Sequence, residues 1–390
     1  MKPIYVRIIQ ALALVLCLIA SSCQREPLQT VETGEVFLPE QDPKYRFSRN
    51  GESSVDLQEA ELTLETLSIL SSRYLSEAYI RTPEQLREAL DLLEYGQYGY
   101  ALLPRAAASP EHQETRAEIT ADIKALVETS ARIGGLGATN PNEHRRREAM
   151  PGRSGYIATS SSSKLSFADE RGLVVMEALR GYILGAVVLD QIEGIHLSDA
   201  VITSDALISA HEGQRLTQGT NYTELEHHWD LAYGYYLHGL RALASGNGAH
   251  ELRGAARRID LAFTLGRIDL DYHLYDKLPE HSRTIRRELA RVLLLRLETL
   301  LIGGNTMANL REDPRFALSM LSEGYGLLYA LQFLRRESGE PYFSRTEVLE
   351  LQSRLIAGTG LWDTERLIGN DAEGGDLRRI MQQLRKRIQL

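Results

Sequence analysis

Apolar side chains recur every three or four residues along nearly all of the chain after residue 54, and this pattern limits the fold more than any other feature. In the first example the recurring residues are Leu57, Ala60, Leu64, Leu67, Leu70 and Tyr74. That spacing places them on one face of an α-helix. We find no stretch with the alternating apolar and polar residues of a strand beside a hairpin turn. The sequence therefore predicts an all-α protein built as a multi-helix bundle.

Thr82 and Pro83 predict the start of a second helix, which ends near Tyr95, because a threonine cap followed by proline is typical of a helix N-terminus. Further helices are expected at about 114–133, 172–192, 198–212, 223–244, 251–267, 280–302, 314–335, 344–357 and 374–388. The segment 172–192 is very apolar, but Glu177, Arg180 and Asp190 interrupt it. A charge in the middle of a membrane span costs about 3 kcal/mol, so we expect a buried helix there.

Residues 134–163 lose the helical period and gain glycine, serine and arginine. We predict a loop insertion, either a mobile surface segment or a lid over a binding site, because long loops in compact domains are often functional.

Two of the expected helices share a small–Tyr–Gly step, Ala232-Tyr233-Gly234 and Gly324-Tyr325-Gly326. Glycine inside a helix costs about 1 kcal/mol relative to alanine, which suggests that another helix approaches closely at each step. The repetition suggests two related helical bundles, 51–245 with the loop insertion and 246–390. Coincidence is the alternative.

The N-terminus has the features of a bacterial targeting segment. Lys2 and Arg7 precede the apolar run from Ile8 to Ala20, which is too short to cross a bilayer core of about 30 Å. The run leads into Ala20-Ser21-Ser22-Cys23, which resembles a lipobox and implies lipidation of Cys23 after removal of residues 1–22 as a lipoprotein signal peptide. An ordinary secretory signal is the alternative. Gln24 is not the aspartate that commonly retains lipoproteins at an inner membrane. In a two-membrane bacterium we therefore expect the lipid anchor to lie in the outer membrane.

The mature chain would lack free thiols, because Cys17 would leave with the signal peptide and Cys23 would carry lipid. No disulfide or cysteine metal site is then expected. Residues 23–50 contain three prolines and little apolar periodicity, which predicts a flexible tether. The 53 acidic residues outnumber the 44 basic ones, which argues against nucleic acid as a partner.

The stretch NYTELEHHWDLAYGYY, residues 221–236, is the richest in side chains that carry chemistry. Thr223 and Glu226 have the spacing of a capping box, so a helix should begin at Thr223. One stripe of that helix contains Leu225, Trp229, Ala232, Tyr236, Leu240 and Leu243, and this spacing predicts packing into the core. We expect Trp229, Tyr233 and Gly234 to be structural.

Two Glu-x-x-His pairs suggest a metal site, Glu193 with His196 and Glu224 with His227. Paired motifs of this kind supply the ligands of di-iron helical bundles. However, Gly194 suggests that the first helix ends there, and two further glutamates cannot be identified. We nevertheless predict a ligand site where the end of the 172–192 helix meets the start of the 223–244 helix, with His196, Asp199, Glu224 and His227 as candidates and His211, His228 and Asp230 nearby. Imidazoles with carboxylates suit iron, zinc or copper, and haem needs only one or two histidines. The alternative is that these histidines are satisfied by structural partners.

Four segments resemble successive blocks of a bacterial family known as domain of unknown function 4856. They are FSRNGESSVD (47–56), GYILGAVVLDQI (181–192), YTELEHHWDLAYGYY (222–236) and LSEGYGLLYALQF (321–333). The resemblance covers roughly residues 45–365 and implies an all-helical, secreted or lipid-anchored protein. It also suggests kinship with imelysin-like proteins, double helical bundles linked to iron or haem uptake. Their Gly-x-His-x-x-Glu motif has a partial counterpart at residues 194–199, which makes His196 and Asp199 candidates.

These observations predict a lipid-anchored envelope protein that binds iron, haem or a related ligand and serves an outer-membrane uptake system. A metal-dependent enzyme of imelysin-like or di-iron type is one alternative. A structural or assembly lipoprotein is another. We find no Ser-His-Asp arrangement, phosphate loop or His-Glu-x-x-His motif in the sequence.

Overall fold

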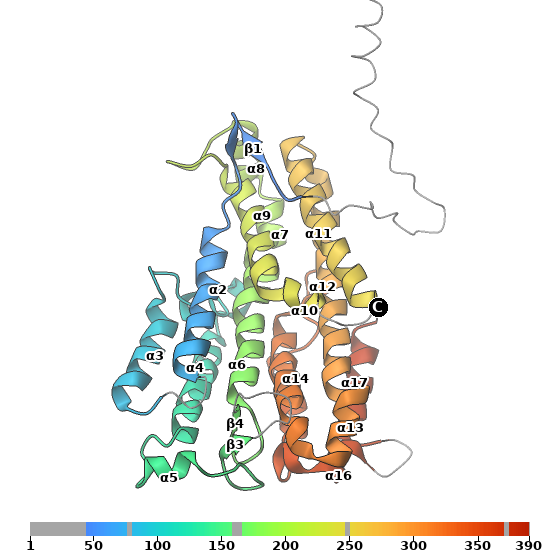
Figure 1. Ribbon diagram of the computed structural model, residues 1–390. Coiled ribbons are helices and arrows are strands. Elements are labelled where there is room, and N and C mark those ends of the chain that lie inside the picture. Colours follow the sequence, from blue (N-terminus) through green and yellow to red (C-terminus); the bar gives the residue numbers. More distant parts are fainter. Residues whose placement is uncertain (1–43, 76–79, 158–165, 246–249, 370–373, 390) are drawn as a thin grey trace, which may run out of the picture. The chain divides into compact units, whose positions relative to one another are not determined.

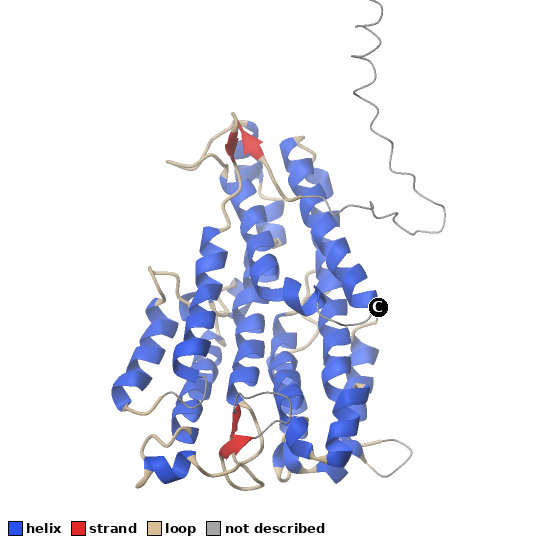
Figure 2. Cartoon of the chain, viewed as in Figure 1, coloured by secondary structure: helices blue, strands red, loops and turns tan. Residues whose placement is uncertain are grey.

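The computed structural model describes residues 44–75, 80–157, 166–245, 250–369 and 374–389. All of these belong to one compact unit, which spans residues 42–390. The predicted signal peptide and Cys23 lie outside the described residues. The described part of the chain is all-α, as predicted, with a few very short strands (Figure 2). No helix in it is long and apolar enough to cross a membrane.

The helices follow the predicted order, and most begin and end within a few residues of the predicted positions. Up to residue 245 they are α2 (Gln58–Leu70), α3 (Pro83–Tyr95), α4 (Arg116–Ile133), α5 (Pro141–Arg145), α6 (Val175–Ile183), α7 (Asp199–Ile202), α8 (Asp205–Glu212), α9 (Glu224–Tyr235) and α10 (Arg241–Ser245). After residue 249 they are α11 (His250–Asp271), α12 (Leu278–Ile302), α13 (Gly304–Glu312), α14 (Leu318–Ala330), α15 (Arg345–Leu355), α16 (Thr364–Ile368) and α17 (Asp376–Arg387). Short 3₁₀ turns occur at Leu103–Arg105 (η3), Pro110–His112 (η4), Tyr275–Lys277 (η7), Pro314–Phe316 (η8), Leu331–Phe333 (η9) and Gly360–Trp362 (η10).

Side-chain caps explain where several helices begin. The Thr82 hydroxyl accepts a hydrogen bond from the backbone N–H of Gln85, and Pro83 occupies the first turn of α3. The Thr223 hydroxyl accepts from the N–H of Glu226, whose carboxylate accepts from the N–H of Thr223, so the predicted capping box of α9 is confirmed. These local hydrogen bonds replace backbone partners that the first turn lacks.

Three helical segments are wound as π-helices and continue an α-helix. They are η1 (Ser71–Leu75) after α2, η5 (Leu184–His196) after α6 and η6 (Tyr236–Leu240) after α9. The η5 segment has 13 residues, and its last turn carries a hydrogen bond of 2.8 Å from the N–H of Leu197 to the carbonyl of Ile192, five residues earlier. π-helical turns are rare and occur frequently at functional sites. The helix therefore continues through Gly194, where the sequence predicted its end.

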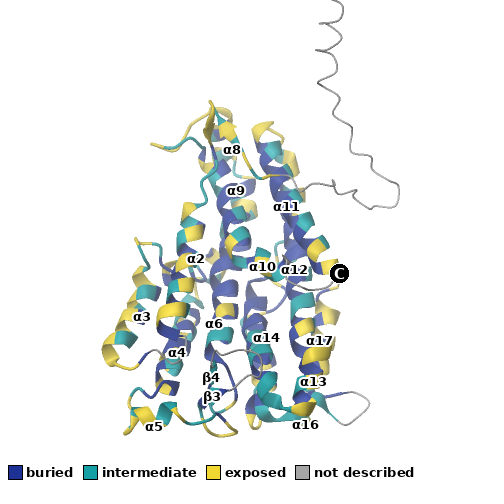
Figure 3. Cartoon of the chain, viewed as in Figure 1, coloured by how far each residue is buried: buried dark blue, intermediate teal, exposed yellow. Residues whose placement is uncertain are grey.

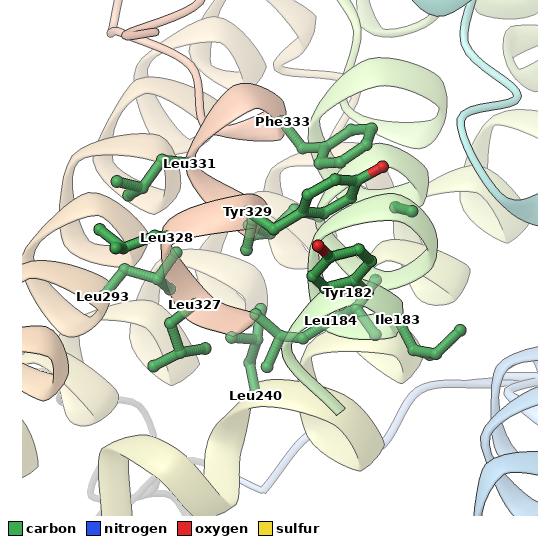
Figure 4. Close-up of a cluster of buried hydrophobic side chains, with 14 of the residues drawn as sticks. Tyr182, Ile183, Leu184, Leu240, Leu293, Leu327, Leu328, Tyr329, Leu331 and Phe333 are labelled. Carbon is green, nitrogen blue, oxygen red and sulfur yellow. The ribbon is translucent and has the colours of Figure 1, made fainter. Parts of the chain in front are cut away.

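The helix formed by α6 and η5 lies at the centre of the core, and most of its residues are buried (Figure 3). Figure 1 shows α6 between α4 and α14, and it packs against both. A side chain at Gly181 cannot be accommodated, because a β-carbon there would lie 2.5 Å from the Cα of Gly326 on α14. Beside this crossing, the rings of Tyr182 and Tyr329 stack with centroids 3.6 Å apart (Figure 4).

The prediction that the small–Tyr–Gly steps mark close helix approaches is confirmed at both places. A β-carbon on Gly234 would lie 3.0 Å from the Cβ of Ala60 on α2, and one on Gly326 would lie 2.5 Å from the carbonyl oxygen of Ala178 on α6. The proposed relationship between two bundles, 51–245 and 246–390, stays a prediction.

Two short hairpins were not predicted. Strands β1 (Ser48–Arg49) and β2 (Glu52–Ser53) pair antiparallel, with Ser48 opposite Ser53 and Arg49 opposite Glu52. Between them Asn50 and Gly51 both have positive φ, which is the backbone of a two-residue hairpin turn. The Asn-Gly pair is a strong hairpin signal, but the flanking strands are too short to show alternation. Within the predicted tether, 23–50, Tyr45 and Arg49 contact α9.

The second hairpin lies at the end of the predicted loop insertion, 134–163. Strand β3 (Gly155–Ile157) pairs antiparallel with β4 (Ser166–Ala168), and Tyr156 lies opposite Phe167. Helix α5 precedes it, and the side chains of Ala149 and Ile157 are buried. The described part of this segment is therefore packed onto the bundle rather than structureless. Residues 158–163 lie outside the described part.

Candidate functional site

The predicted site residues occupy three elements that meet near the end of η5. His196 is the last residue of η5 and is buried. Asp199 is the first residue of α7 and is exposed, and Glu224 is the first residue of α9 and is also exposed. His227 lies one turn further along α9 and is half-buried. The expectation that the end of η5 meets the start of α9 is thus confirmed, although only some of the candidates face each other.

His196 and His228 form the closest pair of imidazoles in this region. Their Nδ1 atoms are 2.9 Å apart, a distance at which one ring donates and the other accepts. Burial, aided by the neighbouring imidazoles, lowers the pKa of His196 well below its usual value, and burial also lowers the pKa of His228. Both rings are therefore neutral at pH 7, and each has one nitrogen lone pair that can accept a hydrogen bond or bind a cation.

A layer of polar groups surrounds this pair on α2, η3 and α9. The ring of Tyr235 is stacked against His196 with centroids 6.0 Å apart, and its hydroxyl donates to Glu59 Oε1 at 3.4 Å. The same carboxylate oxygen accepts from Arg105 Nε at 2.9 Å. Gln191 of η5 donates to the carbonyl of Arg105 at 3.0 Å and thereby ties η3 to the π-helix. The histidine pair therefore lies beside a partly buried ion pair and not in a purely apolar core.

Two nitrogen atoms at the site have no protein partner among the described residues. His196 Nε2 and His227 Nδ1 are both inaccessible to solvent and form no hydrogen bond. The ring of His227 stacks on Tyr222 with centroids 4.3 Å apart. Buried polar atoms are usually paired, so these two atoms are sites where a ligand could bind.

The proposed di-iron ligand set is not assembled. Glu193 Oε2 accepts from the backbone N–H of Arg335 at 2.8 Å, and Asp199 pairs with Arg286 at 3.2 Å. Nowhere in the described part of the chain do three His, Cys, Asp or Glu side chains gather as a metal-binding group. The i, i+3 spacing of Glu193 and His196 predicted one shared face, but the wider turn of the π-helix changes which residues share a face. His211 is satisfied by the Thr223 hydroxyl at 2.8 Å and the Leu270 carbonyl at 3.0 Å.

Glu193 is nevertheless unusual, because its carboxyl group is fully buried. Burial raises its pKa to about 8, although Arg286 and Arg335 oppose that shift. Its second oxygen, Oε1, has no hydrogen-bond partner among the described residues. Glu193 is therefore protonated at neutral pH and can hold or release a proton inside the bundle.

A second buried polar group, not predicted from the sequence, is centred on Arg267 of α11. Its guanidinium pairs with Glu226 at 2.7 Å, with Asp230 at 3.3 Å, and with Asp271. Glu226 also pairs with Arg49 at 2.9 Å. A signal was present, because Arg267 lies between Phe263 and Leu270 on the apolar face of α11.

The segment before α2 completes this network. The Tyr45 hydroxyl donates to Asp230 Oδ1 at 2.5 Å, and the Arg267 guanidinium lies over the ring of Phe47 at 4.9 Å. Burial raises the pKa of Asp230 to about 7, despite the neighbouring Arg267. Asp230 is therefore a partner of Arg267 and Tyr45 and not of the histidines, which corrects its predicted place in the ligand site.

The three residues predicted to be structural all lie in or against the core. Trp229 is 2% exposed, and its indole N–H donates to the Phe263 carbonyl at 2.8 Å. Tyr233 is half-buried and stacks on Tyr45 with ring centroids 3.9 Å apart. Gly234 is buried at the crossing with α2.

No curated protein and no solved structure matched this chain. The family described as Domain of unknown function (DUF4856) matches residues 42–390, which includes every described residue of the bundle and all four sequence blocks. The kinship with imelysin-like proteins stays a prediction. The chain belongs to the DUF4856 family.

Proposed function

We propose that this protein is a lipid-anchored binding protein of the cell envelope that takes up a transition-metal ion, with ferrous iron as the first candidate, at His196 and His228. The observation that carries the proposal is the 2.9 Å separation between the Nδ1 atoms of buried His196 and half-buried His228. Neutral imidazole is a preferred ligand of iron, zinc and copper. The anchor at Cys23 and an outer-membrane uptake partner belong to the same proposal and rest on the N-terminal sequence.

The distance between the two nitrogens suits a shared ion. Imidazole nitrogens bind such ions at about 2.0–2.1 Å, so two of them at a right angle around one ion are about 2.9 Å apart. At a tetrahedral angle the two nitrogens are roughly 3.4 Å apart, so they would have to separate by about half an ångström. The burial that keeps both rings neutral also favours metal binding, because the hydrogen between the two Nδ1 atoms only has to move to an Nε2 and no net proton is lost.

The surroundings support an ion over haem. Cavities of about 300, 400 and 450 Å³ lie on the described part of the chain, and neither His196 nor His228 lines any of them. Tyr235 covers one side of His196 and is itself fully buried. Haem on that side of His196 would have to displace Tyr235, whereas an ion needs only the imidazole nitrogens. Two protein ligands leave positions for water or a carboxylate, which is compatible with reversible loading.

Protein purified without chelator should be analysed for its metal content, and the metal-free protein should then be titrated anaerobically with ferrous iron, zinc and haemin. We expect wild type to bind ferrous iron, and His196→Ala and His228→Ala each to weaken binding at least tenfold. His238→Ala is the matched control, because His238 is exposed and lies on η6, the continuation of α9. Circular dichroism checks that the variants are folded.

Two outcomes would contradict the proposal. In one, no ion binds to the wild type, and in the other both histidine variants bind like the wild type and the control. Haemin binding that survives both substitutions would place a haem site elsewhere, and the iron titration then decides the function of this pair.

A further inference from the structure

A cavity of about 400 Å³ lies between α11 and α12, which pack side by side along much of their length. Both helices are labelled in Figure 1. The cavity is lined by His250, Glu251, Gly254, Arg258, Arg291, Leu294 and Leu295. None of these residues belongs to the histidine pair or to the network around Arg267, so this groove is a separate feature of the bundle.

Three arginines surround one buried carboxylate, that of Glu288, which lies beside the groove and does not line it. Glu288 Oε2 accepts from Arg258 Nη2 at 2.8 Å, and Glu288 Oε1 accepts from Arg287 Nε at 3.4 Å. Arg291 Nε lies 3.8 Å from the same carboxylate, which is beyond hydrogen-bond distance. Arg287 turns away toward Glu337, at 3.4 Å. Arg258 and Arg291, from two different helices, therefore reach the groove with one carboxylate between them.

These two guanidinium groups keep donors for another anion. Arg258 uses Nη2 on Glu288, and Arg291 lies beyond hydrogen-bond distance from that carboxylate. The side chains of Arg258 and Arg291 are 30% and 32% exposed, so each is open to the groove while its stem is packed. Planar guanidinium forks match phosphate oxygens closely, and charge-assisted hydrogen bonds of this kind are strong. Glu251, exposed at the start of α11, is the one acidic side chain in the lining.

One part of the groove, a turn after Arg291 on α12, is apolar. Leu294 and Leu295 of α12 line it, and Leu295 is only partly buried. Gly254 leaves space on the α11 side, since a β-carbon there would meet only the end of the Arg258 side chain, at 3.2 Å. A ligand that contacts both the arginines and the leucines of the groove has an anionic head and an apolar body.

We propose that the groove between α11 and α12 binds a phosphate group attached to an apolar body, with Arg258 and Arg291 on the phosphate and Leu294 and Leu295 on the apolar part. Such a ligand can come from a membrane phospholipid or from a soluble organic phosphate, and the two sources share this chemistry. The proposal does not depend on metal binding at His196 and His228.

Calorimetric titration tests the proposal with hexyl phosphate as the probe, using the chain with Cys23→Ser so that no lipid anchor contributes. We expect hexyl phosphate to bind at least tenfold more tightly than inorganic phosphate. Arg291→Gln is the key variant, because Arg291 makes no hydrogen bond to Glu288 and its loss should leave the fold intact. It should weaken binding of hexyl phosphate at least tenfold, as should Arg258→Gln. Arg283→Gln is the control, because it removes the same charge from an exposed position on α12.

The source of the phosphate is identified by a second titration with vesicles of phosphatidylglycerol in phosphatidylcholine. Vesicle binding that Arg291→Gln abolishes and hexyl phosphate competes away indicates a lipid headgroup. Binding of hexyl phosphate without vesicle binding indicates a soluble ligand. The proposal is overturned if wild type does not bind hexyl phosphate, if Arg291→Gln binds it like Arg283→Gln, or if inorganic phosphate binds equally well.

Discussion

Replacing Trp229 by alanine should lower the free energy of unfolding by about 4–6 kcal/mol. Truncating a large buried aromatic side chain costs about 3–5 kcal/mol, and Trp229 is 2% exposed. The indole N–H also donates to the Phe263 carbonyl at 2.8 Å, and losing that hydrogen bond adds about 1 kcal/mol. Trp229→Phe keeps part of the ring and should lose less than half as much as the alanine variant.

Gly266 makes this prediction specific to one packing arrangement. A β-carbon on Gly266 would lie 2.6 Å from Cη2 of Trp229, closer than real β-carbons approach their neighbours. Gly266→Ala should therefore destabilise the wild type by about 1–3 kcal/mol, as overpacking usually does. In the Trp229→Ala background the same methyl group enters the space that the indole has left. There it should be neutral or stabilising by up to about 1 kcal/mol, since alanine favours a helix over glycine.

The assay is urea unfolding of the four chains, followed by circular dichroism at neutral pH. The two single substitutions and the double substitution form a thermodynamic cycle, and we expect a coupling free energy of about 1–4 kcal/mol. Tyr95→Ala is the control, because Tyr95 is 64% exposed on α3 and its loss should change stability by less than about 0.5 kcal/mol. Additive effects of the two single substitutions, or a cost of Trp229→Ala below about 1 kcal/mol, would refute the packing of α9 on α11 described above.

Three further predictions concern groups whose charge or modification matters. The folded protein keeps Glu193 protonated up to about pH 8 and the unfolded chain releases that proton near pH 4.5, so the folded state binds more protons between these values. The free energy of unfolding should therefore fall as the pH rises across that window, and Glu193→Gln should remove this part of the decline. Urea midpoints measured from pH 5 to 9 that run parallel in the wild type and the variant would contradict this expectation. Arg267→Met should cost about 3–5 kcal/mol in urea unfolding, because it leaves the buried Asp230 without its cation and Glu226 with Arg49 alone, and adding Asp230→Asn should recover part of that loss. Finally, a radioactive fatty acid should label the wild type and not Cys23→Ser, and equal labelling of both would exclude the lipobox.

The location of most helices and of the main core stripe follows from the sequence alone, because both are set by neighbours three and four residues away. Thr82 with Pro83, and Thr223 with Glu226, predicted two helix starts through hydrogen bonds that span a single turn. Trp229 was expected in the core for the same reason, since its partners on the stripe lie on its own helix.

The candidate site was only partly predictable. Glu193 and His196 appeared as a ligand pair because the α-helical period places residues three apart on one face. The segment from Leu184 to Ile192 is buried throughout, so no polar face shows where the period changes. In the π-helix the Glu193 carboxylate meets the backbone N–H of Arg335, and the ring of His196 lies beside that of His228.

The pairing of His196 with His228 and the network around Arg267 were decided only in the tertiary structure. His196 and His228 are 32 residues apart, and the contact depends on how η5 packs against α9. Arg267 lies 41 residues from Glu226 and 213 from Ser54, and its partners come from α9, α11 and the segment before α2. Local spacing carries no information about such contacts, because they depend on how whole helices are arranged around a shared core.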